Sequence, residues 1–240
     1  MGRGKLEKFA VNATRRNVVE PGKELFEQLK GRWNSEFFQN ENPIILEVGC
    51  GKGEYTIGMA QRYPEKNFIG IDIKGNRIWK GSTLAEEAGL TNVAFLRIFI
   101  ETLEQHFGES EVDEIWITFP DPRPRKRDIK RRLTSPRFLE MYERILKPGG
   151  KLHLKTDSAS LFEYSVEVLE ERGVYNLLYT WDLYQSDLQE HTMGIYTTFE
   201  KTYLEQEVPI KYLQYTIQQD KPSKEVPENT EAFNHVRFTS

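Results

Sequence analysis

A glycine-rich loop is the first place in the chain where residue types and spacing could hold a ligand. Gly49, Gly51 and Gly53 follow the apolar run 44–48, and a helical pattern begins directly after them. Glycine lets a backbone turn tightly and approach a ligand closely, and the first turn of a helix offers unpaired N–H groups. Because open α/β sheets bind ligands beyond the carboxyl ends of their strands, this spacing predicts a cofactor-binding loop.

Two acids beside the loop indicate which cofactor it would hold. Glu47 lies in the predicted strand, and Asp72 ends the next apolar run, 19 residues after Gly53. An acid at about that spacing is typical of a ribose-binding group. A dinucleotide fingerprint would have glycine where this chain has Glu54. The pattern favours an adenosine ligand with a cationic tail, S-adenosylmethionine, over NAD, and a plain strand-to-helix turn is the alternative.

A third carboxylate stands next to a strongly basic segment. Asp121 lies between two prolines after the apolar run 114–119. Residues 123–132, called the basic loop below, contain seven Lys/Arg and one Asp in a chain whose net charge is −4. Arginine binds phosphates bidentately, and phosphate contacts make binding dependent on salt. A solvated loop is the alternative, but the position beside an acid at a strand end favours a nucleic-acid partner.

Two further polar groups follow later in the chain. Asp157 comes after the apolar run 151–155, which would place it at the same sheet edge as the other acids. Thr197–Glu200 opens a short helical pattern. Helix capping is the ordinary explanation for both, since Asp157, Ser158 or a threonine can cap a helix.

Alternating strand and helix patterns must position these residues. Apolar runs predict strands at 44–48, 68–73, 93–98, 114–119, 151–155, 174–181 and 210–217. Helical patterns occupy 22–33, 54–63, 76–88, 101–107, 135–146, 158–172 and 197–206. Such alternation predicts an α/β fold with a parallel sheet that helices cover on both faces.

Length and composition set the remaining expectations. The 240 residues suit one domain, with residues 1–20 as a flexible basic arm and residues 219–240 as a loose tail. One cysteine and four histidines without ligand spacing predict no metal. No apolar run approaches the roughly 20 residues that span a bilayer. The start of the chain lacks the apolar core of a signal peptide. We therefore expect a cytoplasmic protein with no membrane partner.

Taken together, the motifs resemble those of the bacterial tRNA (guanine-N(7)-)-methyltransferase family over residues 44–217. The resemblance rests on ILEVGCGKG, FIGIDIK, FPDPRPRKRDIKRRL, LKTDS and TTFE. It implies the Rossmann-like class I methyltransferase fold, with a mostly parallel seven-stranded sheet and an antiparallel last strand. It also implies transfer of a methyl group from S-adenosylmethionine to nitrogen 7 of a guanosine in tRNA, guanosine 46 of the variable loop.

The resemblance assigns roles to residues that match the family motifs, with Asp121 as the catalytic acid. The implied cofactor-binding residues are Glu47, Gly49, Gly51, Gly53, Asp72, Phe99, Ile100 and Asp121. The implied substrate-binding residues are Arg125, Asp157, Thr197, Thr198, Phe199 and Glu200. The implied RNA contacts are Arg123, Lys126, Arg127, Lys130, Arg131 and Arg132.

Three positions depart from the family pattern. Arg123 replaces a tryptophan, and its flat guanidinium can still stack on a base. Arg125 stands where a lysine is usual. Phe99-Ile100 stands where many members have Asp-Ala, an acid that contacts the cofactor. Either Glu101 takes over that contact, or packing and backbone groups hold the adenine.

Guanine nitrogen 7 carries a lone pair and no proton, so it can attack a sulfonium methyl without a general base. The site must align the nitrogen, the methyl carbon and the sulfur. Carboxylates near the base would stabilise the positive charge that develops on it. We assign that joint role to Asp121, Asp157 and Glu200.

Two other functions stay open at the level of sequence. One is a methyltransferase for a small molecule or a protein, because a fold does not determine its substrate. The other is a non-catalytic RNA-binding protein, which the Phe99-Ile100 departure would favour. Transfer of label from S-adenosylmethionine into tRNA tests the first, and cofactor binding by calorimetry tests the second. We expect tRNA as the partner of a monomer or a homodimer.

Overall fold

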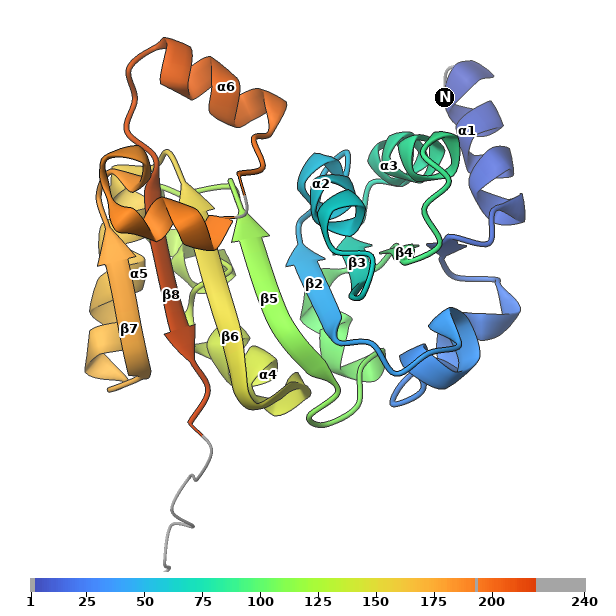
Figure 1. The fold of residues 1–240 in the computed structure, drawn as a ribbon, viewed down its shortest axis with the longest axis horizontal. Helices are drawn as coiled ribbons and strands as arrows, with labels where there is room; N and C mark the ends of the chain where they lie inside the picture. Colours follow the sequence, from blue (N-terminus) through green and yellow to red (C-terminus); the bar gives the residue numbers. More distant parts are fainter. Residues whose placement is uncertain (1–2, 193, 219–240) are drawn as a thin grey trace, which may run out of the picture.

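Eight strands form a single sheet in the computed structural model, which describes residues 3–192 and 194–218 (Figure 1). The strands are β1 (Val18–Val19), β2 (Ile44–Val48), β3 (Asn67–Ile71), β4 (Val93–Leu96), β5 (Val112–Thr118), β6 (Leu146–Thr156), β7 (Tyr175–Thr180) and β8 (Lys211–Thr216). Their order is β1-β4-β3-β2-β5-β6-β8-β7. The predicted seven strands are confirmed, and β1 is an additional two-residue strand at the edge. The tail 219–240 lies outside the described residues.

The direction of the strands agrees with the predicted fold. Neighbouring strands from β1 to β6 are parallel, whereas β8 is antiparallel to both β6 and β7. The chain proceeds from β2 to β3 and β4 on one side, and then to β5 and β6 on the other. Such a reversal opens a crevice at the carboxyl ends of the strands. The loops after β2, β3, β5 and β6 therefore meet at one edge.

Helices cover both faces of the sheet, as the alternation predicts. On one face, α2 (Glu54–Arg62) and α3 (Gly75–Glu87) pack over one apolar cluster, and on the other α4 (Pro136–Ile145) and α5 (Ala159–Glu171) pack over a second. Every residue of β2, β3 and β4 is buried, which is why these strands read as continuous apolar runs. The short helix α6 (Thr198–Glu205) lies beyond the carboxyl end of β6 (Figure 1).

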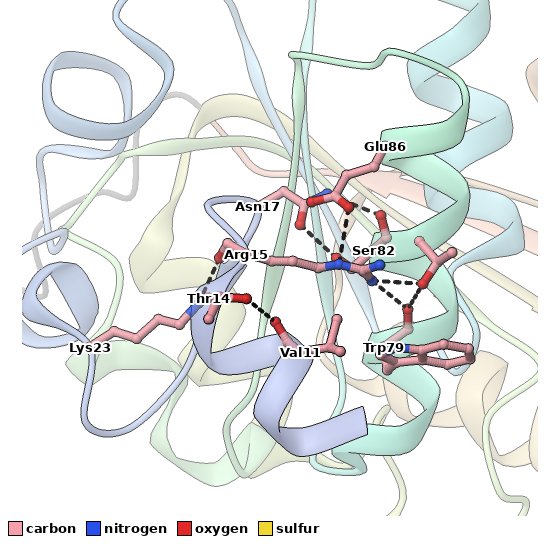
Figure 2. A network of polar contacts seen from close by, with 9 residues as sticks. Val11, Thr14, Arg15, Asn17, Lys23, Trp79, Ser82 and Glu86 are labelled. Carbon is pink, nitrogen blue, oxygen red and sulfur yellow. Dashed lines mark hydrogen bonds and ion pairs between the residues drawn. The ribbon is translucent and has the colours of Figure 1, made fainter. Parts of the chain in front are cut away.

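The start of the chain differs from the flexible basic arm predicted for residues 1–20. Residues Arg3–Thr14 form α1, which lies beside α3 (Figure 1). The buried Asn12 donates a hydrogen bond of 2.9 Å from Nδ2 to the carbonyl oxygen of Gly75. Figure 2 shows Arg15 reaching α3, where it donates to the Trp79 carbonyl at 3.1 Å and pairs with Glu86 at 3.0 Å. Polar contacts fix α1, and these leave no periodic apolar pattern in the sequence.

The helix predicted for residues 22–33 is also wrong. A 3₁₀ turn, η1 (Glu24–Glu27), and a π-helical turn, η2 (Trp33–Phe38), flank Gly31, whose φ of +71° interrupts a right-handed helix. Trp33 is nonetheless buried and stacks on Phe107 with ring centroids 5.4 Å apart. Residues Ile100–Gln105 likewise form a 3₁₀ helix, η3, and three more are η4 (Lys126–Arg131), η5 (Leu183–Gln185) and η6 (Asp187–Thr192). Among the described residues, no helix is long and apolar enough to cross a membrane.

Candidate active site

The glycine loop has the tight geometry that its composition predicts. Gly49, Gly51 and Gly53 have φ values of +80°, +58° and +74°, in the left-handed region that favours glycine. The N–H groups of Gly49 and Cys50 both donate to the carbonyl oxygen of Ile71, at 2.8 and 2.9 Å. A Cβ atom on Gly53 would lie 2.6 Å from the Phe95 ring. The loop is thus bound to the end of β3 and can accept no larger side chain at its last glycine.

Asp72 lies at the end of β3, next to this loop. The residue is 6% exposed, and its carboxylate accepts hydrogen bonds from the N–H groups of Gly51, at 3.2 Å, and Lys74, at 2.7 Å. Arg77 lies 3.5 Å from it. These contacts orient the carboxylate in an open cleft, called the cofactor cleft below. Its lining includes Gly49, Asp72, Phe99, Ile100, Asp121 and Arg123.

Glu47 lies at the bottom of an adjoining cavity that shares Gly49 with the cleft. Its carboxylate accepts hydrogen bonds from the Thr118 hydroxyl at 2.5 Å and from both the N–H and the hydroxyl of Thr56. Burial raises the pKa of Glu47 to about 7, although these hydrogen bonds lower it. A cation bound in this cavity would favour the ionised carboxylate. The residues therefore fit a ligand with a ribose and a positive charge.

Asp121 is an exposed acid of the cofactor cleft, on the side of the basic loop. Its side chain is 62% exposed, and its carboxylate lies 3.2 Å from both the Nε and the backbone N–H of Arg123. The φ of Arg123 is +47°, so the chain turns sharply there. The structure brings Asp121 to the same cleft as Asp72, as the strand-end argument predicts.

The basic loop divides into an exposed part and one buried anchor. Arg125, Lys126, Arg127, Lys130 and Arg131 are exposed, and all except Arg125 lie in η4. Arg132 is only 7% exposed. Its guanidinium donates two hydrogen bonds of 3.3 Å to the Arg123 carbonyl and lies 4.5 Å from the Tyr164 ring centroid. We therefore correct the role expected for Arg132, because a guanidinium used in this way holds the loop and is not presented to RNA.

Asp157 does not cap the helix that follows it. Ser158 caps α5, accepting a 3.3 Å hydrogen bond from the Leu161 N–H. The Asp157 carboxylate instead interacts with the hydroxyl of Tyr203 in α6 and raises its pKa. The Asp157 carbonyl accepts a hydrogen bond of 2.9 Å from Lys211 Nζ. Asp157 thus links the end of β6 to α6 and β8.

The segment Thr197–Glu200 has two different environments. Thr197 caps α6 and forms a reciprocal capping box with Glu200. Thr197 and Phe199 line the cavity above Glu47, and Phe199 is 68% exposed. The Thr198 N–H donates to Glu54 at 2.6 Å. Glu200 is fully buried, so it does not reach a bound base as expected from sequence.

Sequence reasoning missed Thr118 and Arg77, which line the site, and also Lys155, which lies behind it. Lys155 Nζ lies 2.7 Å from Glu200, and both side chains are fully buried. The Tyr184 hydroxyl also donates to Glu200. A lysine near the end of an apolar strand was the only sign of this pair in the sequence, and nothing indicated a partner 45 residues away.

The Phe99-Ile100 departure gives the cleft an apolar wall. Phe99 is 63% exposed and Ile73 is 37% exposed, and both line the cofactor cleft. The Thr102 N–H and hydroxyl both donate to the Phe99 carbonyl, which fixes the backbone there. The Glu101 carboxylate pairs with Arg137 at 3.7 Å. Packing is thus the alternative that this geometry favours for holding an adenine.

Known proteins resemble this chain in sequence and in fold. A family model described as "Putative methyltransferase" matches residues 41–213. A tRNA (guanine-N(7)-)-methyltransferase of Cytophaga hutchinsonii is 50% identical over 217 residues, which cover 90% of this chain and 98% of that protein. One of Bacteroides fragilis is 45% identical over 229 residues, covering 94% and 90%. The 16S rRNA methyltransferase KamB shares the fold, with a TM-score of 0.59 and 18% identity over 80% of this chain and 95% of its own.

Proposed function

We propose, because the chain belongs to the tRNA (guanine-N(7)-)-methyltransferase family, that it transfers a methyl group from S-adenosylmethionine to nitrogen 7 of a guanosine in tRNA. The observation that carries the proposal is a single cleft lined by Asp72, by Asp121 and by cations of the basic loop. Asp72, which would bind the cofactor, and the cations that would bind RNA phosphates therefore line the same cleft. S-adenosylmethionine supplies the methyl group as a sulfonium cation.

The residues of the cleft would bind and orient this donor. Asp72 accepts hydrogen bonds from ribose hydroxyls, which is the ordinary use of an acid at this strand end. Phe99 and Ile73 provide apolar surface for the adenine. Glu47 supplies the negative charge that favours a sulfonium in the adjoining cavity.

The transfer needs alignment and charge stabilisation. The lone pair of nitrogen 7 forms the new N–C bond, the C–S bond breaks, and its electron pair goes to sulfur. Positive charge thereby moves to the guanine, where a nearby carboxylate stabilises it. We assign this role to Asp121, an exposed carboxylate next to the basic loop, and we assign Asp157 to substrate binding beside α6. Glu200, being buried, is assigned to positioning α6.

Further parts of the proposal rest on resemblance. We assign the reaction to guanosine 46 of the variable loop. We place the protein in the cytoplasm, where tRNA is abundant, as a monomer or a homodimer that needs no metal. The basic loop gives this chain the means to bind an RNA backbone.

Nucleoside analysis tests the proposal directly. Unmodified tRNA transcripts are incubated with the protein and S-adenosylmethionine, digested to nucleosides and analysed by mass spectrometry. We expect 7-methylguanosine from the wild-type transcript and none from a transcript with adenosine at position 46. The matched protein control is Asp72→Ala, which should fail to bind the cofactor. Absence of 7-methylguanosine from the wild-type transcript, with a protein that binds S-adenosylmethionine, would refute the assignment.

A further inference from the structure

Cations line the cofactor cleft on the side opposite the basic loop as well. Arg123 and Arg131 line one side, and Lys74 and Arg77 line the other, at the start of α3. Lys80 is exposed on the next turn of α3. The cleft therefore lies between two groups of positive charge that come from distant parts of the chain.

The helix α1 adds a cation to the second group and fixes it there. Lys8 Nζ lies 4.4 Å from the centroid of the Trp79 ring in α3. Asn12 anchors α1 to the carbonyl of Gly75. Arg15, directly after α1, contacts four residues of α3, among them Ser82 at 3.2 Å (Figure 2). Because of these contacts the charge of Lys8 has a set position over Trp79, the residue before Lys80 in α3.

None of these three lysines has a carboxylate partner, so their charges are not neutralised within the described residues. Within residues 3–192 and 194–218, no acid lies at ion-pair distance from Lys8, Lys74 or Lys80. By contrast, Lys66 and Lys147 pair with Glu114 and Asp113 at 3.4 and 2.9 Å. A cluster of like charges without internal partners is a surface on which a polyanion binds favourably.

We propose that Lys8, Lys74 and Lys80 form a second phosphate-binding surface for tRNA, across the cofactor cleft from the basic loop. The inference rests on the proposed function, because it takes tRNA as the polyanion. The RNA backbone would be held on both sides of the cleft, and the target base would enter between the two supports. Contacts on two sides would also limit rotation of the tRNA about the basic loop.

Salt-dependent binding tests the surface. The Kd for tRNA is measured from about 50 to 200 mM salt for wild type, K8Q/K80Q, K74Q and the control K30Q/K151Q. Lys30 and Lys151 are exposed and lie outside both cationic groups, so the control removes the same charge as the double variant. Each phosphate that a variant no longer binds should reduce the slope of log Kd against log salt by about 0.7–0.9, and K8Q/K80Q should bind roughly tenfold more weakly.

The outcomes separate this surface from the proposed function. The melting temperature and the Kd for S-adenosylmethionine, both measured for each variant, establish that the fold and the cleft are intact. If K8Q/K80Q and K74Q keep the slope and the Kd of the control, the surface does not bind tRNA. Formation of 7-methylguanosine by the wild type would still support the proposed methyltransferase activity in that case. If the wild type forms no 7-methylguanosine, the proposed function fails whatever the lysines do.

Discussion

Lys155 and Glu200 form an ion pair of 2.7 Å in which neither side chain is exposed to solvent. The pair joins the end of β6 to the first turn of α6, and Thr197 and Phe199 beside it line the cavity above Glu47. Burial lowers the pKa of Lys155, and the charge of Glu200 raises it again. Removing two charges from water costs several kcal/mol each, so the pair is stable only while both partners are present.

Breaking this pair should therefore destabilise the protein and loosen α6. We expect K155M to lower the free energy of unfolding by about 3–5 kcal/mol, because Glu200 would be buried without a counter-charge. The double variant K155M/E200Q should recover part of that loss, since a neutral amide still accepts a hydrogen bond from Tyr184. Urea unfolding measures both. Equal stability of K155M and the double variant would contradict the account.

The double variant should weaken the binding of tRNA more than the binding of the cofactor. In K155M/E200Q the KM for tRNA should rise, because α6 carries Phe199 and is capped by Thr197. The affinity for S-adenosylmethionine should change less, because Asp72 and the glycine loop lie on other elements and the α6 segment borders the cofactor only at the cavity above Glu47. Steady-state kinetics with tRNA and calorimetry with the cofactor measure the two effects. A loss of cofactor affinity with an unchanged KM for tRNA would contradict this assignment of α6.

Periodicity was sufficient to predict the sheet and most of its helices. β2 begins and ends at the predicted residues, because a strand buried on both faces is a short apolar run between loops. The glycine loop and Asp72 followed from that prediction, since strand ends in a parallel sheet meet at one edge. This part of the site depends on local sequence and on topology alone.

The features that sequence reasoning missed depend on contacts between distant residues. Asn12 and Arg15 fix α1 by polar contacts, which have no period. Within the basic loop, nothing in the composition distinguishes Arg132, which folds inward, from Arg131, which does not. The local sequence around Glu200 would be the same whether its side chain faced a substrate or Lys155. Only the packed structure decides these cases.

Asp121 should be needed for turnover and not for tRNA binding. Its carboxylate is exposed in the cofactor cleft and contacts only Arg123 among the described residues. We expect Asp121→Asn to reduce the single-turnover rate by on the order of 100-fold, because a neutral amide stabilises a developing cation poorly. The tRNA Kd should stay within a few-fold of wild type. Single-turnover rates equal to wild type would remove Asp121 from the mechanism.

Arg132 and its exposed neighbours should behave differently. K130Q/R131Q should flatten the salt dependence of tRNA binding, by about 0.7–0.9 in slope for each phosphate that is no longer bound. R132Q should instead lower the melting temperature, because it removes the bonds to the Arg123 carbonyl and the stacking on Tyr164. Its salt slope should match that of wild type. A flattened slope in R132Q would mean that the guanidinium does reach a phosphate.

Glu47 should make cofactor affinity depend on pH. Its pKa of about 7 means that the carboxyl is mostly protonated at pH 6 and mostly ionised at pH 8. A sulfonium cation favours the ionised form, so the affinity for S-adenosylmethionine should rise with pH, by about tenfold from pH 6 to pH 8 if binding fully releases the proton. S-adenosylhomocysteine lacks that charge but keeps the same amino-acid group, so its affinity should change much less.

Calorimetry with both ligands checks this prediction, and E47Q is the matched variant. The amide that E47Q introduces cannot ionise, so the difference between the two ligands should no longer vary with pH. In the ligand-free protein the sign is opposite. The raised pKa of Glu47 gives stability that is complete below its ordinary pKa of 4.5 and is lost as the pH rises through about 7. A wild-type preference for S-adenosylmethionine that stays constant from pH 6 to pH 8 would show that Glu47 does not sense the sulfonium.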